Sequence, residues 1–133
     1  MLLATDARMA RLVVANSRGD TKGNLVGVRL ARLNVETSLR RFIAEKVLPH
    51  GDAWEQQGFV PRAVLREMGE LGFLGIRYEE EYGGSALDTL STVVLAEELG
   101  RSTYGGFAVT VLVHTDMASP HLHNAGSKAQ KAA

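Results

Sequence analysis

The chain has 133 residues, of which 45% are hydrophobic and 23% charged, and its formal net charge is zero. This is the size and composition of one globular domain, and a balanced charge argues against a nucleic-acid or anionic-membrane binder. The lack of cysteine excludes disulfides, zinc ribbons and thiol catalysis, and no apolar run reaches the roughly 20 residues that span a membrane.

The charge is unevenly distributed along the chain. Residues 1–50 carry nine Lys or Arg and four Asp or Glu, whereas residues 51–100 carry three and ten. The two segments could attract each other or form separate solvated faces, and we favour the solvated faces. The first eleven residues contain charges too early for a secretory signal. We therefore expect a cytoplasmic protein, or a mitochondrial matrix protein if the source is eukaryotic.

The first 34 residues lack a clear hydrophobic period. Residues 18–24 are polar and rich in turn formers, which indicates a loop or disorder. Residues 25–33 are ambiguous between strand and helix. We assign residues 1–34 to an N-terminal extension, open to disorder, and residues 35–133 to one domain.

From Asn34 onward the apolar residues recur at helical spacing, which predicts a helix that Pro49 ends. A second helix is predicted to start at Pro61, and residues 72–76 form an apolar run typical of a buried connection. The glycine pair at 83–84 predicts a turn. A third helix is predicted from Asp88 or Thr89 to Gly100.

The stretch from Tyr104 to Ala118 is the most apolar, so we expect it to form the central helix. Ser119 and Pro120 are typical of a helix start, which predicts a new short helix that ends at Gly126. One more helix would follow Ser127. The predicted fold class is all-α, an irregular or orthogonal bundle of five to six helices.

The residue types that carry chemistry do not form a recognisable site. The histidines lack a third convergent metal ligand, and Glu97 and Glu98 point about 100° apart on a helix, so they are not a facing acid–base pair. Gly105 and Gly106 could approach an anion at a helix start, but close helix packing explains them as well or better. We predict no catalytic, metal-binding or cofactor-binding residue.

Three stretches in order nevertheless carry a resemblance. They are Phe42–Pro49 with Trp54 and Pro61; Met68–Ile76 leading into Glu80-Glu81-Tyr82-Gly83-Gly84-Ser85; and Leu95–Leu99 followed by Pro120 and Ala125–Lys131. Together they resemble the N-terminal helical domain of the acyl-CoA dehydrogenase family over residues 36–131. The chain departs from the family pattern at Glu79, where Pro is common, and at Ala86, where Gly is usual.

The resemblance implies an enzyme that uses FAD to oxidise an acyl-CoA thioester to the trans-2-enoyl thioester. It also implies a glutamate base, an electron-transfer flavoprotein as electron acceptor, and a homo-oligomer. In the family the base and most of the flavin site lie in domains that would follow Lys131. We therefore expect a fragment that is not catalytic alone and does not retain FAD.

The resemblance further implies that the apolar helix after Leu99 forms one wall of the acyl-chain pocket. The wall residues it implies are Val109, Leu112, Val113 and Asp116. The competing interpretation is that the three apolar residues fill the domain's own core. The alternative function is a non-enzymatic helical interaction or oligomerisation module, a remnant of such an enzyme.

Overall fold

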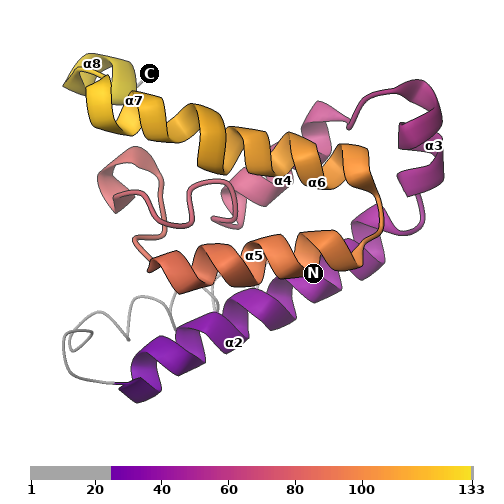
Figure 1. Cartoon of the computed structure of the whole chain (residues 1–133), viewed down its shortest axis with the longest axis horizontal. Helices are drawn as coiled ribbons and strands as arrows, with labels where there is room; N and C mark the ends of the chain where they lie inside the picture. The colour runs from indigo at the N-terminus through magenta and orange to yellow at the C-terminus, as the bar shows by residue number, and fades with distance from the viewer. Residues whose placement is uncertain (1–24, 133) are drawn as a thin grey trace.

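The computed structural model describes residues 25–132, and this part of the chain is helical with no strand (Figure 1). The predicted all-α class is therefore confirmed. The α-helices are α2 (Leu25–Phe42), α3 (Gly51–Gln57), α4 (Arg62–Glu70), α5 (Thr89–Arg101), α6 (Gly105–Leu112), α7 (Ser119–Ala125) and α8 (Lys128–Ala132). Two π-helical turns, η2 (Ile43–Val47) and η4 (Val113–Ala118), and a 3-10 turn, η3 (Glu80–Tyr82), complete the described elements. The loop predicted at 18–24 lies outside the described residues.

The local signals placed both ends of α5 and the starts of α4, α6 and α8 within a residue, whereas α3 lies where no helix was expected. Residues 25–33, ambiguous in sequence, are the first turns of α2, which continues across the boundary predicted after residue 34. Asp88 caps α5, because its Oδ1 accepts the Ser91 N–H at 3.0 Å. Pro61 precedes the first residue of α4 rather than occupying it.

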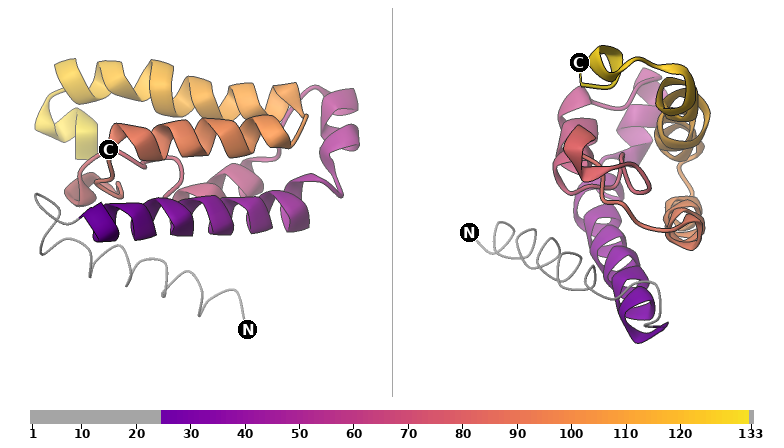
Figure 2. Two further views of the ribbon diagram at one scale, coloured as in Figure 1. Left: turned by 60° about the horizontal axis from the view of Figure 1, so that its bottom comes forward. Right: turned by 90° about the vertical axis from the view of Figure 1, so that its left-hand side faces the viewer.

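Helices α2 and α5 run side by side in the same direction, and the helix that starts at Gly105 returns alongside α5 (Figures 1 and 2). Leu39 from α2 and Leu95 and Leu99 from α5 have no exposed surface. Fully burying a leucine side chain contributes about 1.5–3 kcal/mol, so the contact between α2 and α5, which we call the seam, makes a large apolar contribution to the fold. The other buried core residues are Val35, Phe42, Ile43, Val47, Trp54, Met68, Phe73, Ile76, Phe107 and Val111.

Ion pairs join the basic start of the chain to its acidic middle. Arg40 donates to both carboxylate oxygens of Glu98, from Nε at 3.0 Å and from Nη2 at 2.8 Å. Arg32 pairs with Asp88 beside the N-terminus of α5, and Lys46 lies 3.2 Å from a carboxylate oxygen of Glu67. Our preference for separate solvated faces was wrong for these residues, because the parallel packing of α2 and α5 brings opposite charges together at both ends.

The prediction of a new helix at Ser119 was also wrong. Ala118 and Ser119 both have right-handed helical backbone angles, so α6, η4 and α7 form one continuous helix over residues 105–125. We call it the long helix. Proline lacks an N–H and its ring clashes with the carbonyl four residues earlier. Here the π turn just before Pro120 accommodates that clash by widening the helix instead of ending it.

Candidate functional site

The glycine-rich segments pair backbone to backbone beneath the long helix. The Ser85 N–H donates to the Gly75 carbonyl at 2.9 Å, and the Ala86 N–H donates to the Tyr78 carbonyl at 2.9 Å. A Cβ on Gly84 would lie 2.0 Å from the Tyr78 carbonyl oxygen, so only glycine fits there. The Gly72-Phe73-Leu74-Gly75 and Gly83-Gly84-Ser85 segments therefore have a structural role, which is to fix the loop that carries Tyr78.

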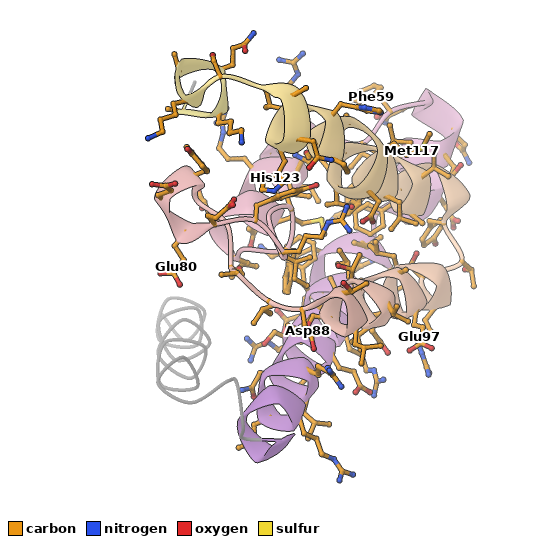
Figure 3. All side chains as sticks on the ribbon, turned by 60° about the vertical axis from the view of Figure 1, so that its left-hand side comes forward. Phe59, Glu80, Asp88, Glu97, Met117 and His123 are labelled. Atoms are coloured by element: carbon orange, nitrogen blue, oxygen red, sulfur yellow. The ribbon has the colours of Figure 1, made fainter. Side chains whose placement is uncertain are left out.

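The outer side of the long helix exposes a line of large apolar side chains. Val109 is 58% exposed, Val113 is 41% exposed and Met117 is 63% exposed. Met117 projects from this helix in Figure 3. We call these three residues the apolar stripe. Val109 and Val113 do not fill the domain's own core, whereas Leu112 is half-buried and packs against it.

The π turn affects how closely Met117 follows the line of Val109 and Val113. In an α-helix successive residues turn by about 100°, so Met117 would lie about 80° away from Val109. The π turn takes in one extra residue, which turns the subsequent part of the helix back by roughly one residue's angle. Met117 therefore returns to the side of Val109 and Val113. Sequence reasoning missed Met117, and the signal that could have identified it is its four-residue spacing from Val113.

Asp116 is turned away from the stripe toward the loop below. Its Oδ2 accepts the Thr115 hydroxyl at 2.9 Å, and its Oδ1 lies 3.9 Å from Nη2 of Arg77. Of the four residues expected at the pocket wall, the structure thus places Val109 and Val113 together on the exposed side. Leu112 lies at the inner edge and Asp116 in a polar cluster.

Two further titratable groups, His123 and Glu98, make structural contacts. Nδ1 of His123 lies 3.3 Å from the Glu79 carboxylate, and Figure 3 shows His123 between the long helix and the loop. Glu98 is buried between two arginines: hydrogen bonding and charge attraction from Arg40 lower its pKa against the opposing effect of burial. A carboxylate held ionised in this way is a poor general base, because its affinity for a proton is reduced. Among residues 25–132 no three histidine or acidic side chains converge on a metal position.

The helix start at Gly106 already binds a carboxylate. Its N–H donates to Oε1 of Glu55 at 2.8 Å, beside a hollow of about 180 Å³ between α3 and α6. A flavin pyrophosphate at this helix start would meet the negative charge of Glu55, so these residues do not fit the cofactor. The described residues also include no helix long and apolar enough to cross a membrane.

Comparisons with known proteins agree with the motifs. Residues 32–133 match the family described as acyl-CoA dehydrogenase, N-terminal domain. The chain is 40% identical over 93 residues to the mitochondrial long-chain specific acyl-CoA dehydrogenase of Mus musculus, covering 70% of this chain and 21% of the relative. It is 30% identical over 132 residues to the (2S)-methylsuccinyl-CoA dehydrogenase of Cereibacter sphaeroides, covering 97% and 24%.

A bacterial relative gives a similar picture. The probable acyl-CoA dehydrogenase YngJ of Bacillus subtilis is 32% identical over 97 residues, which are 73% of this chain and 25% of that protein. The chain therefore spans about a fifth to a quarter of the length of these curated relatives. No solved structure matches the chain.

Proposed function

We propose that this chain, which belongs to the acyl-CoA dehydrogenase family through its N-terminal domain, contributes one wall of a pocket for the acyl chain of an acyl-CoA thioester. The family depends on FAD and acts on acyl-CoA substrates. The observation that carries the proposal is the apolar stripe: Val109, Val113 and Met117 lie in line on one helix and are not used by the domain's core.

An acyl tail suits this surface chemically. A hydrocarbon chain offers no hydrogen-bond donor or acceptor, and each Å² of apolar surface removed from water contributes about 25 cal/mol. Leu112 supports the stripe from below, and we place Asp116 at its polar edge rather than against the tail. This wall has no group that removes a proton or accepts a hydride.

We place the chemistry outside residues 25–132. The dehydrogenation of the acyl-CoA, the flavin and the glutamate base then belong to other parts of a full enzyme. The electron-transfer flavoprotein, a homo-oligomeric state and a cytoplasmic or matrix location are parts of the same proposal. This chain alone is expected to retain no FAD. A purified chain with the visible absorbance of stoichiometric flavin would contradict that expectation.

The wall can be tested in a chimaera of the Bacillus subtilis relative, with its matching segment replaced by residues 32–133. Val113→Phe should fill the pocket, so activity on long acyl-CoA should fall more than activity on short acyl-CoA. The matched control is Val93→Phe, at a position 48% exposed on α5. Equal kcat/KM profiles for the two variants across acyl lengths would contradict the wall.

The second candidate function is an interaction module, and the same exposed stripe favours it. Exposed apolar side chains in line promote association, so the isolated chain should then form oligomers and bind an apolar dye. Light scattering separates the two functions when it is combined with the chimaera. Oligomers that Met117→Gln disperses, together with an unchanged acyl-length profile for Val113→Phe, would favour the module.

A further inference from the structure

The π turn in the long helix leaves one carbonyl without its helical donor. The Ser119 N–H donates to the His114 carbonyl, five residues earlier, and the Ser119 hydroxyl donates to the same oxygen at 2.6 Å. In this register the next donor would be residue 120, for the Thr115 carbonyl. Residue 120 is proline and has no N–H to give.

The Tyr78 hydroxyl takes the place of that donor. It donates to the Thr115 carbonyl at 2.9 Å from the loop below the helix. Thr115 is buried, and a buried carbonyl without a partner costs about 1–3 kcal/mol. The bond from Tyr78 therefore stabilises the folded chain.

The position of Tyr78 is fixed on several sides. Its carbonyl accepts the Ala86 N–H, its ring lies 5.2 Å from the His123 ring, and the Arg77 guanidinium lies 5.7 Å from its ring centre. The Ala86 bond ties the Tyr78 backbone to the loop, whereas the His123 ring belongs to the long helix itself. Tyr78 therefore links the loop to the helix, and a hydroxyl held in this way can hold the helix register.

We propose that Tyr78 is a positioning residue that holds the π turn in the register required by Pro120. In that register Met117 lies in line with Val109 and Val113, so Tyr78 determines the length and outline of the apolar stripe. The relevance of this register to acyl-chain choice rests on the proposed function, whereas the register itself does not.

A double-mutant cycle in the full chain tests the register, using Tyr78→Phe, Pro120→Ala and the pair. The readout is the ¹³C methyl resonance of Met117, assigned with Met117→Leu, together with the thermal midpoint. Tyr78→Phe should shift the resonance and lower the midpoint. In the Pro120→Ala background the same change should have less than about half the effect, because the introduced alanine restores an N–H near the Thr115 carbonyl.

The matched control is Tyr82→Phe, which removes a tyrosine hydroxyl from the 3-10 turn η3 of the same loop. It should leave the Met117 resonance in place. Equal effects of Tyr78→Phe with and without Pro120 would show only general packing and would overturn the proposal. An unmoved resonance in Tyr78→Phe would overturn it too.

The chimaera separates this proposal from the proposed function. If both hold, Tyr78→Phe changes the ratio of kcat/KM for long and short acyl-CoA, and Tyr82→Phe does not. A shifted Met117 resonance with an unchanged ratio would keep the positioning role and overturn its link to the acyl pocket. A changed ratio for Val113→Phe with no Met117 shift in Tyr78→Phe would keep the pocket and overturn the positioning role.

Discussion

The facing sides of α2 and α5 differ from the outer side of the long helix in what their residues contribute. Leu39, Leu95 and Leu99 are fully buried between α2 and α5, and Glu98 forms an ion pair with Arg40. On the long helix, Val109 and Met117 are more than half exposed. The surface between α2 and α5 stabilises the fold, whereas the exposed side of the long helix remains free to contact a ligand or another protein segment.

The difference also concerns backbone geometry. The part of α2 that packs along α5 is a regular α-helix, held by apolar contacts and ion pairs that bridge the two helices. The long helix departs from α geometry at Val113–Ala118, where no core leucine packs. Departures of this kind cost stability and are frequent at functional positions. A second π turn, η2, continues α2 and contributes Ile43 and Val47 to the core. The π turn of the long helix therefore supports the proposed pocket wall only together with the exposed apolar residues beside it.

The largest effect should come from the seam between α2 and α5. Leu39→Ala removes a fully buried side chain and leaves a cavity, which should lower the free energy of unfolding by about 2–5 kcal/mol. Val113→Ala, on the stripe, should lower it by less than about 0.5 kcal/mol. Urea unfolding measures both, and equal losses would erase the proposed difference between the two surfaces.

The loop that carries Tyr78 should be nearly as sensitive. Gly84→Ala forces a methyl group against the Tyr78 carbonyl, 2.0 Å from the new Cβ, and should cost about 3 kcal/mol. Gly83→Ala meets no atom within 4 Å but has a φ of +82°, so it should cost about 1 kcal/mol from backbone strain alone. Thermal unfolding of the two variants ranks them, and a reversed order would show that the close backbone approach is absent.

The two helices of the seam could be predicted from the sequence, because the spacing of apolar residues and the helix-capping signals there agree with each other. Leu39, Phe42 and Ile43 recur at helical spacing, and Asp88 is a strong N-cap residue, so both helices follow from short-range patterns. The pairing of Arg40 with Glu98 could not be derived this way. It depends on the parallel packing of two helices, and the two paired residues are 58 positions apart in the sequence.

The long helix was harder to predict because two signals compete at Ser119 and Pro120. In most sequences this pair begins a helix, but here the apolar contacts of Val111 and the Thr115–Tyr78 bond keep the helix continuous. The outcome depends on a tyrosine 42 residues before the proline. A local pattern contains no information about that partner.

Acid should weaken the seam through Glu98. Hydrogen bonding to Arg40 and the nearby charges lower the pKa of Glu98 below its ordinary value of 4.5. The unfolded chain therefore binds the proton first as pH falls, so the contribution of Glu98 is complete above about pH 5 and is lost below it.

Glu98→Gln should reduce the free energy of unfolding at pH 7 by about 1 kcal/mol and flatten its decline below pH 5. The arginine partners are more than half exposed, which limits the effect. Glu97→Gln, an exposed neighbour, is the control and should leave the profile unchanged. Identical acid profiles for Glu98→Gln and the unaltered chain would show that the Arg40–Glu98 ion pair does not contribute to the stability of the seam.

The smallest effect on stability should come from the stripe, where the effect on surface properties is largest. Met117→Gln should change the free energy of unfolding by less than about 0.5 kcal/mol, because Met117 is 63% exposed. It should nonetheless reduce binding of an apolar dye. Met68→Gln is the matched change at a fully buried methionine and should destabilise the fold by several kcal/mol. A stability loss in Met117→Gln as large as that in Met68→Gln would place Met117 in the core. The apolar stripe would then be reduced to Val109 and Val113.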